Sequence, residues 1–341
     1  MLSYVLKRLL LMIPTLLGVL TLTFVVIQFV PGGPVEQLMA QSRIGGGGAY
    51  KARGDTDAKQ IEELKKLYGF DKPAHVRYVE MLTSFATFDL GRSFLQNKPV
   101  WTLIKEKLPV SISLGLWTFF ISYLISVPLG IAKAVREGSR FDALTTLAVL
   151  VGFAIPGFVL GVFLIVLFAG GTFWDVFPLR GLVSDNWQEL AWPARIRDYL
   201  WHMALPLVCL VIGSFAELTM LTKNTFVEEM RKQYVLVARA KGLSMRRVLG
   251  KHMLRNALVP LVTGFPSAFI GAFFAGSLLI ETLFSLDGLG LLSYESVVRR
   301  DYPVVLGSLY FFTLIGLAVK LVADLMYVVV DPRVQFQAVG K

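Results

Sequence analysis

Residues 233–260 have the sequence QYVLVARAKGLSMRRVLGKHMLRNALVP, which is rich in lysine and arginine and contains no acidic side chain. The stretch lies within a chain of 341 residues that is 55% hydrophobic, with a mean hydropathy of +0.62. In a soluble protein, a basic run of this kind usually forms a solvated helix face. The segments around it therefore decide how it is interpreted.

The composition is that of an integral membrane protein. Only 17% of the residues are charged, whereas a soluble domain has about a quarter. A helix needs about 20 apolar residues to cross a bilayer core. Runs of this kind cover residues 9–30, 110–131, 144–168, 203–222, 258–280 and 304–329. We therefore predict an all-α membrane protein with six transmembrane helices, the first of which is retained as a span.

The charges in the loops predict the orientation of the chain. Residues 223–257 hold nine basic and two acidic side chains. Residues 132–143 hold three basic and two acidic side chains. Residues 171–199 hold three basic and four acidic side chains. Because short cytoplasmic loops are enriched in Lys and Arg, we expect both termini and the two basic loops to be cytoplasmic. The long segment 31–107 then lies in the periplasm.

The chain is predicted to have four parts. These are an N-terminal span (1–30), a periplasmic segment (31–107), a core transmembrane domain with the loop 233–260 (108–330), and a cytoplasmic tail (331–341). Within the periplasmic segment, residues 43–58 are charged and include the glycines 45–48, so they should form a mobile loop. Residues 59–107 show helical spacing of apolar residues and should form two or three short helices.

Several classes of function are excluded by missing motifs. The sequence has no G-x-x-x-x-G-K-[ST] motif, so we predict no ATPase site of its own. With three histidines, the single cysteine Cys209, and neither HExxH nor CxxC, we predict no metal site and no directly bound cofactor. No nucleophile and base can be assembled, so we predict that the chain is not an enzyme. Its basic residues lie between apolar runs, which favours a membrane surface over nucleic acid.

The basic stretch itself is predicted to form two short helices hinged at Gly242, with Ser244 suited to cap the second one. In the second helix the apolar positions share one side, and basic residues take much of the rest. The apolar side comprises Met245, Val248, Leu249, His252 and Met253. Such an element either lies on anionic lipid or docks on a cytoplasmic partner, and the pattern alone leaves both open.

The amino-acid sequence of this stretch closely resembles the cytoplasmic EAA loop of permeases in binding-protein-dependent ABC importers. The form is that of the oligopeptide and dipeptide (Opp/Dpp) subfamily, matched at Ala238, Arg239, Ala240, Lys241, Gly242, His252, Arg255, Asn256, Ala257 and Pro260. Leu243 and Ser244 complete the predicted ATPase-coupling residues. Where the general pattern has Glu-Ala-Ala, this chain has Leu236, Val237 and Ala238, so the acidic residue is missing.

The resemblance extends along the chain. It includes LKRLLLMIPTLLGVLTLTFVVIQFVPGGP (6–34), YGFDKPAHVRYVEM (68–81), FDLGRSF (88–94), ETLFSLDGLGLLSYESVVRRDYPVVLGSLY (281–310) and VDPRV (330–334). In detail the chain is most similar to the Yej-type permeases, whose systems import oligopeptides and the peptide-nucleotide antibiotic microcin C.

The resemblance implies a type I ABC importer permease fold in the bacterial inner membrane. It also implies a second homologous permease, two ATP-binding subunits, and a periplasmic or lipid-anchored substrate-binding protein as partners. A peptide would pass between the two permeases, and ATP would act only through the partner subunits. The loop 233–260 would sit in a cleft of the ATPase and act as a coupling helix.

Three charges within the predicted spans are candidate functional residues, namely Glu217, Lys320 and Asp324. In one interpretation, the three form a structural cluster in which Lys320 neutralises one of the carboxylates of Glu217 and Asp324. In the other, Glu217 faces the translocation path, where it could meet the amino terminus of a peptide.

Two other classes of function compete with the permease. A channel or secondary transporter that works alone would have spans broken by glycine or proline, which Pro156, Pro206 and Pro266 support slightly. A structural scaffold would need no basic coupling loop.

Overall fold

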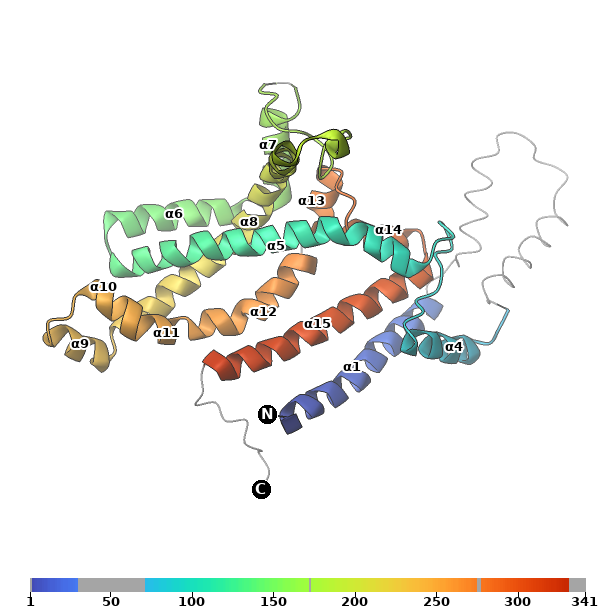
Figure 1. The fold of residues 1–341 in the computed structure, drawn as a ribbon, viewed down its shortest axis with the longest axis horizontal. Helices are drawn as coiled ribbons and strands as arrows, with labels where there is room; N and C mark the ends of the chain where they lie inside the picture. Colours follow the sequence, from blue (N-terminus) through green and yellow to red (C-terminus); the bar gives the residue numbers. More distant parts are fainter. Residues whose placement is uncertain (1, 30–70, 172, 275–276, 331–341) are drawn as a thin grey trace. The chain divides into compact units, whose positions relative to one another are not determined.

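The computed structural model describes residues 2–29, 71–171, 173–274 and 277–330 (Figure 1). Within these ranges the chain is helical and contains no β-strand, so the all-α prediction is confirmed for the described residues. The predictions for the glycine-rich loop 43–58, for residues 59–70 and for the tail 331–341 lie outside them.

Helices occur along the predicted apolar runs and also between them. They are α1 (Leu2–Phe29), α4 (Ala74–Ala86), α5 (Val100–Val135), α6 (Arg140–Ala154), α7 (Gly157–Phe168), the short turn η1 (Trp187–Glu189), α8 (Trp192–Met230), α9 (Gln233–Ala240), α10 (Met245–Val248), the π-helical turn η2 (Leu249–Met253), α11 (Leu254–Ala257), α12 (Val259–Phe274), α13 (Ser277–Leu283), α14 (Leu289–Val298) and α15 (Tyr302–Val330). In the described part of the chain, α1, α5, α8 and α15 are long and apolar enough to cross a membrane.

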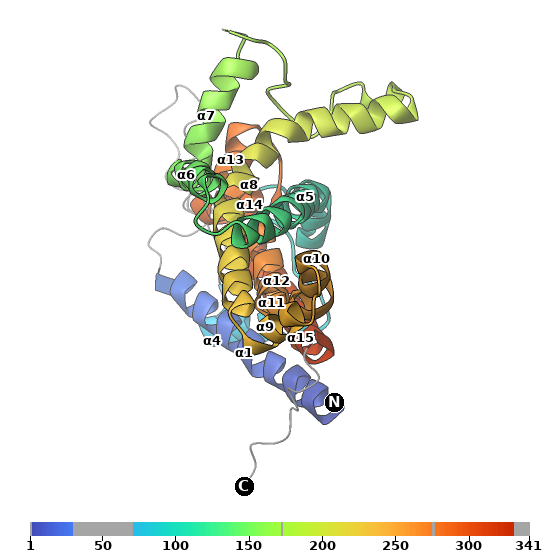
Figure 2. The same ribbon diagram turned by 90° about the vertical axis from the view of Figure 1, so that its left-hand side faces the viewer.

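The third predicted span is bent. α6 and α7 meet at an angle of 91°, and the turn between them is visible in Figure 2. Pro156 stands directly before α7, and Ile155 has an extended backbone with ψ of 116°. Proline disfavours a helical conformation in the residue before it, which explains why the apolar run 144–168 is not one straight helix. The fifth predicted span covers α12 and part of α13, and its residues 275–276 are not described.

The chain divides into two compact units. The first comprises Met1–Leu108 and Leu292–Leu317, and the second comprises Pro109–Leu291 and Ala318–Lys341. The helices α5, α14 and α15 contribute residues to both units.

In the first unit, α4 is hydrogen-bonded to α1 and to the first half of α15. The hydroxyl groups of Tyr78 on α4 and Thr21 on α1 lie 2.5 Å apart. The Tyr310 hydroxyl of α15 donates a hydrogen bond of 3.0 Å to the Phe85 carbonyl, and the two rings lie 5.1 Å apart. These contacts fix α4, which lies within residues 59–107, where the sequence predicts short helices.

The second unit has one apolar core near α7 and another beneath the basic loop. The first core joins α5, α7, α8 and α13, and its buried members are Leu114, Ala169, Met203, Leu205, Leu207, Cys209, Ile280, Phe284 and Leu286. Cys209 is 3% exposed, as expected for a small side chain in an apolar run.

Candidate functional site

The basic stretch folds as short helices in the second unit, and α9 ends at a glycine hinge. Gly242 has a φ of +82°. Its N–H donates to the Arg239 carbonyl at 2.9 Å, and the N–H of Leu243 donates to the Ala238 carbonyl at 3.3 Å. This pair of bonds is the Schellman helix end, which needs a left-handed residue that glycine supplies without steric cost. The predicted hinge is present, and its physical basis is a helix C-cap.

One side of the stretch is buried against α5 and α8. Val248 and Met253 are 0% exposed, and Met245, Leu249 and His252 are half-buried. The buried members of this cluster are Ala134, Phe226, Val235, Ala238, Val248, Met253 and Ala257. The predicted apolar face is therefore confirmed, and the chain's own helices cover it.

The opposite side is exposed and combines positive charge with apolar surface. The side chains of Leu236 and Val237 on α9 are 62% and 53% exposed. Other exposed residues of the stretch are Arg239, Ala240, Lys241, Gly242, Ser244, Arg246, Arg247, Lys251, Arg255 and Asn256, whereas Leu243 is half-buried. Exposed apolar side chains rimmed by charges are typical of a surface that binds another protein.

The prediction for Ser244 holds for its position but not for its side chain. Ser244 stands at the N-cap of α10, yet its hydroxyl makes no capping bond. Its carbonyl instead accepts the N–H groups of Arg247 and Val248, each at 3.0 Å.

Glu229, at the end of α8, ties the segments of the loop together. This carboxylate is buried, at 4% exposed, and lies 2.5 Å from the Lys232 ammonium. It also accepts hydrogen bonds from the Tyr234 hydroxyl at 2.5 Å and from the Asn256 amide at 3.0 Å. Burial, and then the bond to Glu229, raise the pKa of Tyr234 to about 12, so its hydroxyl keeps its proton at neutral pH. Asn256, a predicted coupling residue, thus holds α11 in place.

A second buried network joins the turn between α5 and α6 to α8. Lys133 is 0% exposed and lies 3.2 Å from an Asp142 carboxylate oxygen. Its ammonium donates to the Thr145 and Thr146 hydroxyls at 2.9 and 2.6 Å. The other Asp142 oxygen accepts from Lys223 at 2.7 Å. Because buried charges are costly without partners, this network fixes three helices beside the cluster under the basic loop.

The same helices approach each other closely at Gly130. A Cβ atom there would lie 2.5 Å from the Thr222 Cβ and 2.8 Å from the Thr219 carbonyl oxygen. Glycine therefore permits the packing of α5 on α8 that lets Lys133 and Lys223 contact the same carboxylate, that of Asp142.

Sequence reasoning missed both polar networks. Lys223 and Asp142 are 81 residues apart, and Asn256 and Glu229 are 27 apart, so no local spacing relates them. One signal in the sequence could have indicated the Lys133 network. Lys133 and Asp142 each lie directly beside an apolar run that contains no charge, 110–131 and 144–168.

The three intramembrane charges lie in the second unit. Glu217 and Lys320 are exposed on this chain, and Asp324 is half-buried. The cluster and its role in the path stay predictions.

Comparison with known proteins places this site in a transport family. Residues 126–336 match the family model described as the binding-protein-dependent transport system inner membrane component. The matched range contains the basic stretch and both buried networks. The chain belongs to this family.

Relatives of this permease span its whole length. It is 52% identical to the peptidoglycan transport system permease protein YejB of Agrobacterium fabrum, over 98% of each chain. It is 50% identical to the inner membrane ABC transporter permease protein YejB of Escherichia coli O157:H7, over 98% of this chain and 99% of that one. The oligopeptide transport system permease protein AppB of Bacillus subtilis is 34% identical, over 98% of this chain and 100% of that one.

The fold of the permease is similar to a chain of the MetNI methionine ABC transporter in an inward-facing conformation. The TM-score is 0.50 at 16% sequence identity, covering 67% of this chain and 97% of that one. At this identity the likeness concerns the fold alone.

These findings confirm the resemblance seen in the sequence. The chain is the permease of an ATP-driven importer of the inner membrane, and it is a transport component rather than an enzyme. Family membership decides against a channel or secondary transporter that works alone, and against a structural scaffold.

Proposed function

We propose that this permease forms half of a path for oligopeptides and couples it to a separate cytoplasmic ATPase. The names of its relatives, which cover peptidoglycan, oligopeptide and dipeptide transport, support a peptide-like substrate. Peptide antibiotics such as microcin C belong to the same chemical class. The other half of the path comes from a second, homologous permease.

The exposed face of α9 carries this proposal. Leu236 and Val237 stand next to Arg239 and Lys241, while the buried face is fixed by the cluster around Val248. An apolar pair on a rigid, charged element suits a protein groove, because the groove can bury the pair and orient the charges. A helix lying on lipid would instead have turned its buried face to the membrane.

The proposed assembly has two permeases, two ATP-binding subunits and a substrate-binding protein. The permease binds no cofactor directly, because ATP acts through its partners. It crosses the membrane six times, with α6 and α7 as one bent span and with both termini and residues 223–257 in the cytoplasm. Closure of the ATPases on nucleotide would move α9 and, through Glu229 and the Lys133 network, the ends of α5, α6 and α8.

Cross-linking to the ATPase subunit tests the coupling. In a Cys209→Ala background, Ala240→Cys should cross-link to a co-purified ATP-hydrolysing subunit, because position 240 lies on the exposed face. Val79→Cys, 57% exposed on α4, is the control and should give no such product. Absence of an ATPase from the purified complex would contradict the proposal.

A charge placed on the apolar pair tests the contact itself. Leu236→Asp should lower substrate-stimulated ATP hydrolysis by about tenfold or more, as expected for a central interface residue. Val135→Asp is the matched control, since Val135 is 43% exposed in the other basic loop. Equal loss in both variants would show that added charge, rather than lost docking, is responsible.

A further inference from the structure

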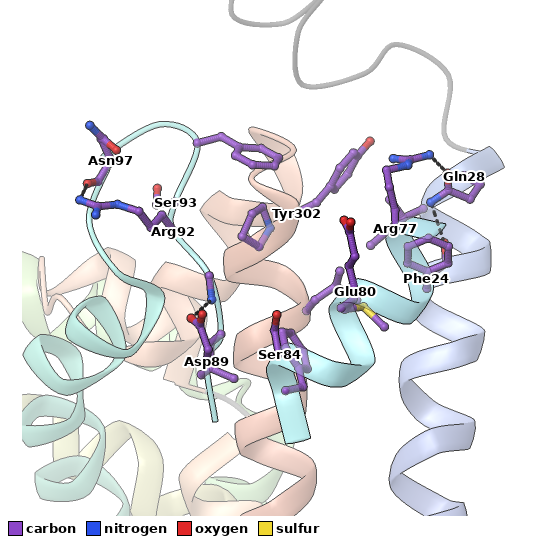
Figure 3. Close-up of a pocket in the computed structure, with 18 residues that line it drawn as sticks. Phe24, Gln28, Arg77, Glu80, Ser84, Asp89, Arg92, Ser93, Asn97 and Tyr302 are labelled. Atoms are coloured by element: carbon purple, nitrogen blue, oxygen red, sulfur yellow. Dashed lines mark hydrogen bonds between the residues drawn. The ribbon is translucent and has the colours of Figure 1, made fainter. Parts of the chain in front are cut away.

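The first unit contains a pocket that the coupling mechanism does not use. It has a volume of about 630 Å³ and lies between the outer end of α1, α4, the loop 89–97 and the start of α15 (Figure 3). This is within the range of sites that hold small ligands, about 300–1,000 Å³. Two sequence motifs build its wall, FDLGRSF (88–94) and the DYP of residues 301–303.

The wall is held rigidly by a buried carboxylate. Asp301 is 3% exposed and accepts hydrogen bonds from the Ser93 hydroxyl and from the Phe94 N–H, the latter at 2.9 Å. The Val100 N–H closes the loop on the Gly91 carbonyl at 2.9 Å. A pocket whose wall is fixed before the ligand arrives loses less freedom on binding.

The lining combines an apolar floor with charges of both signs. Phe85, Leu90 and Leu306 form buried parts of the floor. Figure 3 shows Glu80 standing up from α4 into the open space, with Arg77 on one side and Asp89 on the other. Arg92 and Asn97 belong to the far wall.

Two of these charges have hydrogen-bonding capacity to spare. The Asp89 carboxylate accepts a hydrogen bond from the Gly91 N–H at 3.0 Å. A carboxylate can accept several hydrogen bonds, so Asp89 can accept more. Arg92 donates to the Asn97 carbonyl at 2.9 Å, and a guanidinium has five donors. An anion and a cation therefore stand three residues apart in one rigid loop, over an apolar floor.

We propose that this pocket binds a short peptide on its way to the translocation path. Asp89 would receive the ammonium of the amino terminus, Arg92 the terminal carboxylate, and the floor an apolar side chain. Glu80 already pairs with Lys72 at 2.6 Å, and Arg77 donates to the Gln28 amide oxygen at 2.7 Å, so these two charges border the site rather than bind the ends of the peptide. A zwitterion with apolar substituents matches a site that presents one carboxylate and one guanidinium, Asp89 and Arg92, whereas a purely anionic or cationic ligand would be repelled by one of the two. The inference rests on the proposed peptide substrate and adds a binding step on the permease itself.

Binding of trialanine to the complete transporter in nanodiscs, without its binding protein, tests the site. We expect Asp89→Asn and Arg92→Gln each to weaken binding by about tenfold, the loss typical of one charge-assisted hydrogen bond at a partly exposed site. Asparagine can still accept the Gly91 N–H, so the loop should keep its form. The matched control is Glu106→Gln, whose carboxylate is 44% exposed in an ion pair with Lys98 and does not line the pocket.

Blocked peptides identify which end meets which residue. Acetylation of the amino terminus should weaken binding to the wild-type protein but cause little further loss in Asp89→Asn, and amidation of the carboxyl terminus should do the same for Arg92→Gln. Equal affinities of all variants, or no binding of trialanine to the complex, would overturn the proposal. Variants that lose only the stimulation of ATP hydrolysis by the binding protein would overturn it too, because they would mark a docking surface for that protein.

Peptide uptake by the intact system separates this inference from the proposed function. If wild-type cells take up peptides and the variants bind trialanine normally, only the pocket assignment is wrong. If the wild-type system takes up no peptide, the proposed function itself fails.

Discussion

At the scale of single residues, Gly242 is the position where backbone conformation and coupling meet. Its φ of +82° closes α9, and a Cβ atom there would have nothing within 4 Å. A substitution would therefore strain the backbone without causing a clash, by about 1–2 kcal/mol for a residue other than glycine.

We expect Gly242→Val to insert normally and to lose substrate-stimulated ATP hydrolysis, because the angle between α9 and α10 changes. Gly242→Asn should retain most activity, since asparagine tolerates the left-handed region better. The control Gly138→Val places the same strain at a φ of +73°, also with nothing within 4 Å, in the other basic loop. If Gly242→Val and Lys241→Glu both leave transport intact, the loop is only a helix on the lipid surface.

Asp142 is the residue on which the buried lysine network depends. Asp142→Asn leaves Lys133 buried without a counter-charge, so it should lower the free energy of unfolding by about 3–5 kcal/mol. Adding Lys133→Met should restore much of that loss, because removing both charges costs less than leaving one. Thermal unfolding of the purified protein in detergent measures both effects.

The matched control for Asp142 is a surface ion pair in the same unit. Glu137 and Arg231 lie 3.4 Å apart with side chains 46% and 74% exposed. Glu137→Gln should therefore change stability by less than about 1 kcal/mol. An equally small effect of Asp142→Asn would contradict the role assigned to the network.

At the scale of helices, α8 carries both a membrane span and the connection to the coupling loop. Glu217 lies within its apolar run and is exposed on this chain, whereas Glu229 at its end is buried among donors. The two carboxylates therefore have different surroundings on one helix, and their replacement should have different consequences.

We expect Glu217→Gln to leave the amount of folded protein unchanged and to alter peptide uptake, because its charge is available to the path or to the second permease. Glu228→Gln, exposed near the cytoplasmic end of the same helix, is the control and should alter neither. Destabilisation by Lys320→Ala that Glu217→Gln relieves would instead support the structural pair. Normal abundance together with normal uptake in Glu217→Gln would dismiss both roles.

At the scale of the whole molecule, the arrangement of loops about the membrane is the central prediction. In a Cys209→Ala background, a membrane-impermeant thiol reagent should label Val79→Cys in intact spheroplasts, and Ala240→Cys only after lysis. We expect this result because residues 223–257 contain an excess of Lys and Arg, and loops rich in Lys and Arg stay on the cytoplasmic side. Labelling of position 240 from outside would refute the topology and the coupling mechanism with it.

The sequence by itself determined those features that depend on neighbours along the chain. Apolar runs predicted the helices α1, α5, α8 and α15, because a membrane helix satisfies its own backbone and needs only length and composition. The spacing in residues 245–253 predicted which side of the basic helix is buried, and Gly242 predicted the hinge, since a left-handed C-cap favours glycine wherever it occurs.

Tertiary structure alone decided which distant residues meet. Asp142 with Lys223, Glu229 with Asn256, and Asp301 with Ser93, 208 residues apart, are brought together by helix packing and have no periodic signature. The direction of the bend at Pro156 likewise follows from where α7 packs, because the sequence shows the proline that breaks the helix but not the direction in which the chain continues. The pocket beside Asp89 exists for the same reason, since its charges become a site only when α1, α4 and α15 enclose the space between them.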